Sequence, residues 1–244
     1  MSLLGKASEM RNVIVIVCVV IGLGSTIMAD DFGTGIHQFT IDFVTISGDA
    51  SSANGTGIGP VGSGKTFSDP GNDYRMGVYE ITNDQWDKFE IAYGAVTGAP
   101  ADAYDGDTSY HTGANVPVDR VSWYEAAQFV NWLNTSTGHH AAYKFTGTQG
   151  HGETDLAPYT LGVWDTAEAY GGTHFYRYRH KDALYFLPTE GEWVKAAYWN
   201  GTDLQTYATP SGALPVEDID ANYDYHTLPQ PWDVGSGSEE LNGT

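Results

Sequence analysis

The sequence predicts a single α+β domain with short helices, small sheets and long irregular loops. Three observations lead to this fold class. The chain has 244 residues, which is enough to bury one large core. Three short helical segments begin with the same capping signature, and one segment near residue 40 has the alternation of a half-buried strand. Most of the remaining chain is rich in Gly, Asp, Thr and Tyr without a clear period, and we find neither an internal repeat nor a linker.

The strand prediction is strongest at Phe39–Ile46. Its apolar residues are Phe39, Ile41, Phe43, Val44 and Ile46, which mostly alternate with polar ones. Alternation of this kind places one face of a strand against a core and the other toward water. A second strand-like stretch contains Tyr176, Tyr178 and Leu184–Leu187, just before the third helical segment.

Each predicted helix begins with a capping box. In this motif a hydroxyl accepts a hydrogen bond from the backbone three residues on, and the side chain there accepts from the cap backbone. The three boxes are Thr82–Gln85, Ser122–Glu125 and Thr189–Glu192. The apolar residues that follow at helical spacing are Trp86, Phe89 and Tyr93, then Ala126, Phe129, Val130 and Leu133, then Trp193, Ala196 and Ala197. The first helix is expected to end at Gly94.

The first 29 residues have the pattern of a secretory signal peptide. Lys6 and Arg11 precede an apolar run, Val13–Gly24, and a small residue, Ala29, offers a cleavage site. An uncleaved N-terminal anchor is the alternative, and it would be the chain's only link to a membrane. The expected mature domain is 30–244, secreted or at the cell surface. The single cysteine, Cys18, lies in the leader, so this domain would carry no thiol chemistry.

Charge excludes one large class of partner. The chain has 11 Lys and Arg against 31 Asp and Glu, a net charge of −20, and phosphate backbones need cations, so we expect no nucleic-acid partner. The segment Gly59–Thr66 has the letters of a phosphate-binding loop, but Pro70 and Gly71 follow closely and would break the helix that such a loop needs. We therefore expect no nucleotide site.

Four ordered segments resemble one protein family. They are Tyr74–Asn83, Pro117–Ala127, Phe186–Trp193 and Ala196–Gly201. Together they resemble the formylglycine-generating enzyme, or sulfatase-modifying factor, family, over about residues 40–244. The resemblance implies a variant of the C-type-lectin-like fold, with small sheets, a few helices and long loops. Because a fold does not by itself imply a function, it does not carry the family's chemistry with it.

The catalytic features of that family have no counterpart here. The resemblance implies a copper-binding cysteine pair near the C-terminus in one branch, and iron-binding histidines on an extra helical domain in another. A further C-terminal segment is expected after Asn242–Gly243. The sequence therefore favours a non-catalytic domain for binding or for building an extracellular structure, including a fibre subunit. The alternative is the N-terminal portion of an oxidase whose active-site half lies downstream.

Calcium is the cofactor that the resemblance implies. The family's first calcium site opens with an Asn and the next backbone carbonyl, which correspond to Asn222 and Tyr223, and its second site opens at Asn242 and Gly243. The acidic loops supply the oxygen ligands that calcium prefers.

The remaining chemical candidates have structural interpretations. No two of the eight histidines lie four residues apart, and the adjacent His139 and His140 should point in different directions, so a transition-metal site is not expected. We expect Glu125, Glu190 and Glu192 to serve helix starts. The four glycosylation-like sequons, at Asn54, Asn134, Asn200 and Asn242, are interpreted as chance occurrences in a Gly- and Thr-rich chain.

The aromatic residues suggest a carbohydrate or other surface ligand. We expect Trp86, Trp123 and Trp193 in the core, because they lie at helix starts or faces, and Trp164, Trp199 and Trp232 in loops that are free to bind. Without the family's last segment the sheet would have open edges, which pair readily with other chains. We therefore also expect self-assembly through a neighbouring chain's strand, with Phe39–Ile46 as the donor.

Overall fold

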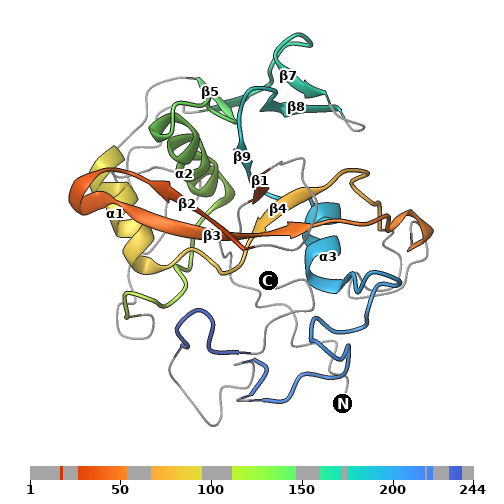
Figure 1. Cartoon of the computed structure of the whole chain (residues 1–244). Helices are drawn as coiled ribbons and strands as arrows, with labels where there is room; N and C mark the ends of the chain where they lie inside the picture. The colour runs from red at the N-terminus through yellow and green to blue at the C-terminus, as the bar shows by residue number, and fades with distance from the viewer. Residues whose placement is uncertain are drawn as a thin grey trace.

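The computed structural model describes residues 17–18, 27–53, 67–94, 112–146, 160–171, 175–217, 219–221 and 231–237 (Figure 1). Its elements are small and widely spaced, in agreement with the α+β, loop-rich prediction. In chain order they are β1 (Val17–Cys18), β2 (Met28–Phe32), η3 (Gly35–His37), β3 (Phe39–Ile46), η4 (Ser51–Ala53), β4 (Tyr74–Gly77), α1 (Asn83–Tyr93), α2 (Trp123–Ser136), β5 (Lys144–Thr146), β6 (Thr160–Gly162), β7 (Ala169–Gly171), β8 (Phe175–His180), β9 (Tyr185–Phe186) and α3 (Glu190–Tyr198).

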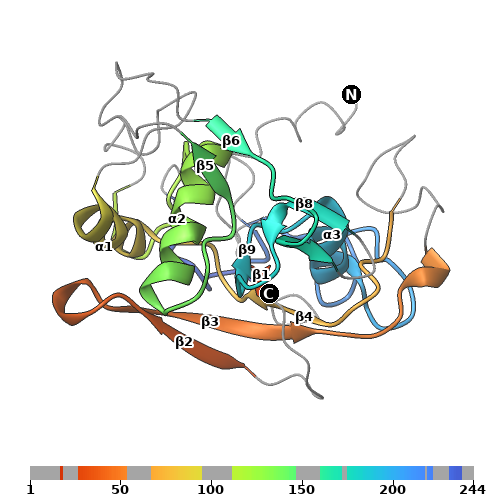
Figure 2. The same cartoon turned by 90° about the horizontal axis from the view of Figure 1, so that it is seen from above.

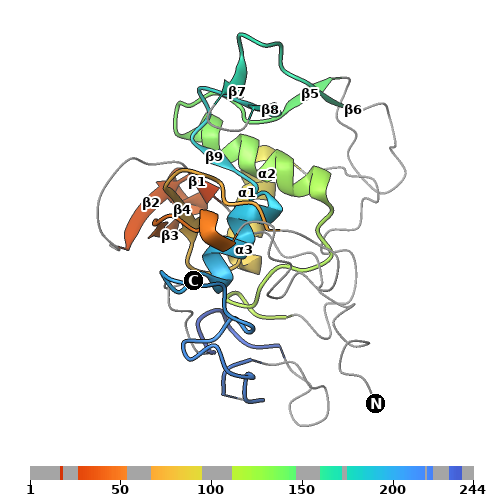
Figure 3. The same cartoon turned by 90° about the vertical axis from the view of Figure 1, so that its right-hand side faces the viewer.

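The main sheet has the strand order β2-β3-β4-β1-β9, and every neighbouring pair is antiparallel. Two further sheets have two strands each, β5-β6 and β7-β8. Helix α2 lies between the main sheet and these two small sheets (Figures 1 and 3). Seen from above, β5 and β6 run over α2 while β8 lies nearer to α3 (Figure 2). The molecule is therefore layered around α2.

The predicted strand at Phe39–Ile46 is confirmed as β3, which buries Phe39, Ile41, Phe43, Val44 and Ile46. It is paired along both edges, with β2 on one side and β4 on the other. As an internal strand it could be donated to another chain only by breaking both ladders. The structure therefore contradicts the choice of β3 as the free donor strand, whereas self-assembly itself stays a prediction.

The strand β1 comes from the apolar N-terminal segment. Val17 pairs with Met76 of β4 and Phe186 of β9, so β1 lies between these two strands. The expected cleavage after Ala29 would fall within β2 and would remove β1 altogether. Within the described ranges, no helix is both long and apolar enough to cross a bilayer. The signal peptide stays a prediction.

All three capping boxes are confirmed. Thr82, Ser122 and Thr189 each accept a hydrogen bond from the third residue of their helix, at 3.3, 3.3 and 3.2 Å. The side chains at those third positions accept from the cap backbone in return, at 3.0, 2.8 and 2.7 Å. Helix α1 ends at Gly94 as expected, with a φ of 97° that glycine adopts at little cost.

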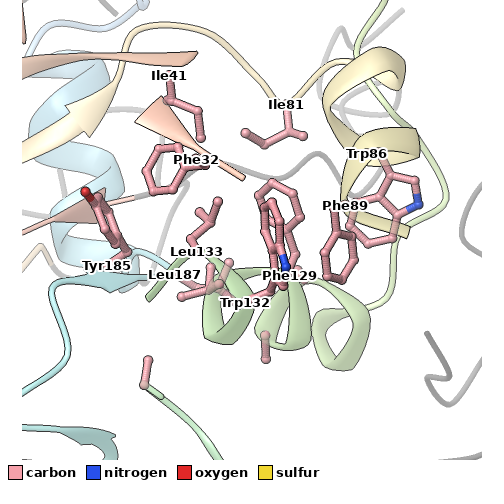
Figure 4. Packing of buried hydrophobic residues seen from close by; sticks show 14 of the residues in the cluster. Phe32, Ile41, Ile81, Trp86, Phe89, Phe129, Trp132, Leu133, Tyr185 and Leu187 are labelled. Atoms are coloured by element: carbon pink, nitrogen blue, oxygen red, sulfur yellow. The ribbon is translucent and has the colours of Figure 1, made fainter. Parts of the chain in front are cut away.

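The largest core cluster joins the two long helices to the sheet (Figure 4). The ring of Phe129 on α2 contacts Phe89 edge-on at 5.0 Å between centroids and stacks on Trp86 at 5.6 Å. Trp86 is fully buried, as predicted from its place on α1. Because fully buried aromatic rings contribute several kcal/mol each, this cluster fixes the position of α2, including its first turn.

Candidate ligand-binding hollow

An open hollow of about 370 Å³ lies where the first turn of α2 meets β8 and the chain that enters α3. We call it the aromatic hollow. It is lined by Trp123, Tyr143, Tyr176, Arg177, Tyr178, Arg179 and the segment Leu187–Thr189. Its volume is in the range of small-ligand sites, and four of its side chains are aromatic.

A buried ion pair supports the hollow. Arg179 donates two hydrogen bonds to the carboxylate of Glu192, at 2.9 and 2.7 Å, and a third to the carbonyl of Leu187. Both side chains are buried. Burial alone would lower the pKa of Arg179, but hydrogen bonds and the charge of Glu192 outweigh it, and the pKa is raised. Likewise burial opposes ionisation of Glu192, yet the bonds from Arg179 hold the pKa of Glu192 below its ordinary value. Both groups are therefore charged at neutral pH.

The segment between β9 and α3 is fixed from several sides. The hydroxyl of Tyr143 accepts a hydrogen bond from the backbone of Leu187 at 2.9 Å. Thr189 and Glu192 form the capping box of α3, and Glu192 also pairs with Arg179. Burial raises the pKa of Tyr143, so its phenol stays protonated. One wall of the hollow is thus preorganised, which lowers the entropic cost of binding a ligand.

Two aromatic side chains of the hollow are open to solvent. Trp123 is 44% exposed and Tyr178 is 51% exposed. Trp123 touches Tyr143 with ring planes at 74° and centroids 5.1 Å apart, an edge contact that holds the indole without covering it. Exposed rings on a rigid support offer flat apolar faces to a ligand, and the indole N–H and phenol O–H offer hydrogen bonds.

The prediction for Trp123 was therefore wrong, and so were those for two loop tryptophans. Trp123 is the first residue of α2, ahead of the buried positions that begin at Glu125. Trp164 is only 8% exposed and donates a hydrogen bond from Nε1 to the carbonyl of Ala142 at 2.9 Å, and Trp199 is likewise buried. Trp193, expected in the core, is partly buried against a smaller cluster, and Trp232 is also partly buried.

The hollow carries one cation that is not neutralised. Arg177 is exposed, and within the described ranges its guanidinium has no hydrogen-bond or ion-pair partner. Four other cations in those ranges do form ion pairs, with Asp30, Asp84, Glu192 and Asp69. Arg179, the second arginine of the hollow, is one of these four. The net charge of the lining side chains and their paired groups is therefore positive.

The described ranges contain no group of three His, Cys, Asp or Glu side chains that could hold a metal ion. The predicted calcium residues Asn222, Tyr223, Asn242 and Gly243 lie outside these ranges. Glu125 and Glu192 serve helix starts as predicted, through their capping boxes. The exposed Glu190 lies in the first turn of α3, also as predicted.

The structure brings together two histidines that sequence reasoning did not pair. The rings of His140 and His180 stack at 3.4 Å between centroids, and Trp164 lies against both. Burial, followed by the charge of His140, lowers the pKa of His180. His139 contacts Tyr185 instead, so the adjacent histidines do have different surroundings. Forty residues separate the stacked pair, and no local pattern indicates such a contact.

The sequence has a clear match among protein families. The model of the sulfatase-modifying factor enzyme 1-like domain matches residues 66–241, more than two thirds of the chain. The chain belongs to this family. The match confirms the resemblance and includes every residue of the aromatic hollow. No curated protein and no solved structure matches the chain.

Proposed function

We propose that this sulfatase-modifying factor family domain is a non-catalytic, secreted or surface-attached module that binds carbohydrate through the aromatic hollow. We also propose that its loop-rich fold is the C-type-lectin-like variant. The observation that carries the function is the pair of half-exposed rings, Trp123 of α2 and Tyr178 of β8, in a hollow whose other wall, Leu187–Thr189, is fixed by the Arg179–Glu192 pair.

Carbohydrate fits this arrangement better than a purely apolar ligand. A sugar ring has a C–H face that can lie on an aromatic ring, and hydroxyls that need hydrogen-bond partners. The hollow supplies both, because its lining includes two tyrosines, Tyr176 and Tyr178, as well as the indole of Trp123. Burial raises the pKa of Tyr176, whose phenol is hydrogen-bonded to Thr189 and stays neutral at physiological pH.

A binding role also fits the composition. The 244 residues contain one cysteine, so these residues do not include the cysteine pair that the family's copper-binding branch uses. The charge of the lining residue Arg179 is compensated by Glu192, and the lining residues that the structure describes include no Cys, Ser, His or Lys. The side chains of the hollow are therefore suited to binding a ligand.

The test is polysaccharide binding by the full chain and by two variants, Trp123→Ala and Tyr178→Ala. Each is expected to weaken binding by about tenfold or more, the usual effect of removing a central aromatic contact. Tyr207→Ala is the matched control, since Tyr207 is an exposed tyrosine outside the hollow. Melting temperatures exclude unfolding as the cause. Equal binding by all four proteins, or turnover of a sulfatase-derived cysteine peptide, would refute the proposal.

Calcium is part of this proposal, at Asn222 and the Tyr223 carbonyl and at Asn242–Gly243. Two of the described residues just before the first site, Glu217 and Asp220, carry carboxylates, and Asp220 accepts from the backbone of Val216 at 2.7 Å. A ligand that binds only the native state raises its stability. Chelation is therefore expected to lower the melting temperature, and added calcium to restore it. An unchanged melt of verified metal-free protein would refute the calcium sites.

A further inference from the structure

We propose that the aromatic hollow selects acidic saccharides, those with a carboxylate or a sulfate ester, through Arg177. This inference rests on the proposed carbohydrate function and adds the ligand's charge. Arg177 lies on β8 between Tyr176 and Tyr178, and all three residues line the hollow. Successive strand residues point to opposite faces, but Arg177 lines the same hollow as Trp123 and Tyr178, so a sugar bound there would have substituents close to Arg177.

The two arginines of the hollow have different roles. Arg179 is buried and its charge is compensated by the bidentate bond to Glu192. A buried guanidinium with its hydrogen bonds satisfied has little attraction left for a ligand. Arg177 is exposed and is without a charged partner in the described ranges. It is therefore the side chain of the hollow that can take up an anionic group.

The chemistry of the guanidinium defines the group that it prefers. Its planar fork of N–H donors matches the oxygens of a carboxylate or a sulfate in a bidentate arrangement, and such bonds are stronger than neutral ones. A neutral sugar hydroxyl would occupy only part of the fork. The hollow should therefore discriminate by charge between saccharides of the same backbone.

The large negative charge of the chain does not remove this local preference. The net charge is −20, but at physiological ionic strength charges beyond about 8 Å are largely screened. The lining residue Thr189 is followed by the exposed Glu190, and Asp182 lies five residues beyond Arg177. Arg177 has no charged partner within the described ranges, and its attraction for an anion acts at contact range.

The experiment compares matched polysaccharides at physiological salt. Polygalacturonate is set against its methyl ester, and dextran sulfate against dextran, with the full chain. At least one acidic form is expected to bind about tenfold or more tightly than its neutral partner, as expected for a charge-assisted hydrogen bond. Polygalacturonate identifies a carboxylate ligand and dextran sulfate identifies a sulfate ligand.

Arg177→Gln is expected to reduce acidic binding to the neutral level, and Arg177→Lys to recover part of it. Lys181→Gln is the control, because Lys181 is an exposed cation just after β8 that does not line the hollow. If Arg177→Gln keeps the preference, or weakens acidic and neutral binding equally, the inference is wrong. The proposed function would still stand if Trp123→Ala removes binding. Absence of any effect of both Trp123→Ala and Tyr178→Ala would instead refute the proposed function itself.

Discussion

Glu192 is the residue on which the support of the hollow depends most. Its carboxylate accepts from the backbone of Thr189 at 2.7 Å and from both terminal nitrogens of Arg179. One side chain therefore starts α3 and neutralises the buried arginine of β8. Replacing it affects a helix start and an ion pair at the same time.

Glu192→Gln is expected to destabilise the protein by about 3–5 kcal/mol, because it leaves a buried arginine without its counter-charge. Thr189→Ala removes one cap acceptor and should cost about 1 kcal/mol. The pKa of Glu192 is lowered in the folded state, so its contribution is full above the ordinary value near 4.5 and disappears as the pH falls through the folded pKa. The difference in the free energy of unfolding between wild type and Glu192→Gln should therefore become smaller as the pH is lowered.

Urea unfolding between pH 7 and pH 3 measures this difference. Glu190→Gln is the matched control, since Glu190 is exposed in the same helical turn. A difference in unfolding free energy that stays constant with pH would contradict the role of Glu192 as the counter-charge of Arg179. So would a loss of stability in Glu190→Gln as large as that in Glu192→Gln.

Sequence patterns predicted one half of what Glu192 does. The capping box is local, so four consecutive residues indicate it. Arg179 lies in another element, and no spacing rule links a strand residue to the third residue of a helix after a turn. The burial predictions for Trp123 and Trp164 were wrong for the same reason. Helical spacing identifies the buried face of a helix, but it does not say whether the first residue of a helix or a tryptophan in a loop is covered. That depends on which distant segment packs against it.

At the scale of elements, two asparagines of α2 form hydrogen bonds with the backbone of neighbouring non-helical segments. The fully buried Asn134 accepts from the backbones of Leu184 and Tyr185 at 2.7 and 3.0 Å. It donates to the carbonyls of Tyr185 and Val130 at 2.9 Å each. All the hydrogen-bonding capacity of this amide is used, and α2 is thereby tied to the start of β9.

Asn134→Ala is expected to cost about 3 kcal/mol or more, because it removes these hydrogen bonds within a buried site. Asn131→Ala is the comparison, since the partly buried Asn131 makes two bonds to the backbone of Tyr143, at 2.8 and 2.7 Å. Thermal or urea unfolding of both variants should show the larger loss at Asn134. Equal losses would mean that burial at Asn134 adds nothing.

The sequon at Asn134 was interpreted as a chance occurrence, and the burial of Asn134 agrees with that interpretation. A buried amide whose hydrogen bonds are all used cannot carry a glycan in the folded protein. Its actual role as a link to β9 has no sequence signal. Helix starts, the β3 alternation and the end of α1 were predictable because their causes lie within a few residues. The contacts between elements were not.

At the scale of the whole molecule, the main sheet depends on β1. Strands β4 and β9 are both paired to β1 and are adjacent to it on opposite sides. The order β2-β3-β4-β1-β9 could not be predicted, because it brings together segments from opposite ends of the described chain. The fold class could be predicted, because it needs only the kinds of element and their lengths.

A protein containing only residues 30–244 is expected to self-associate. It would lack β1 and the first two residues of β2, which leaves an unpaired edge on each of β4 and β9. Light scattering compares this form with the full chain. A compact monomer with a sharp cooperative melt would show that the shortened domain closes its own core.

The position of β1 also determines the order in which strands of the main sheet can pair during synthesis. Val17 is synthesised well before its partner Phe186 in β9, because the two paired residues lie far apart along the chain. Pairing across such a separation carries the entropy of closing a long loop and makes folding slow. The edge strand β9 is therefore added to the sheet after β2, β3, β4 and β1 have been synthesised. A ribosome-bound chain arrested before β9 (Tyr185–Phe186) can pair β1 only with β4, and cleavage after Ala29 at that stage would remove β1 before its second ladder forms.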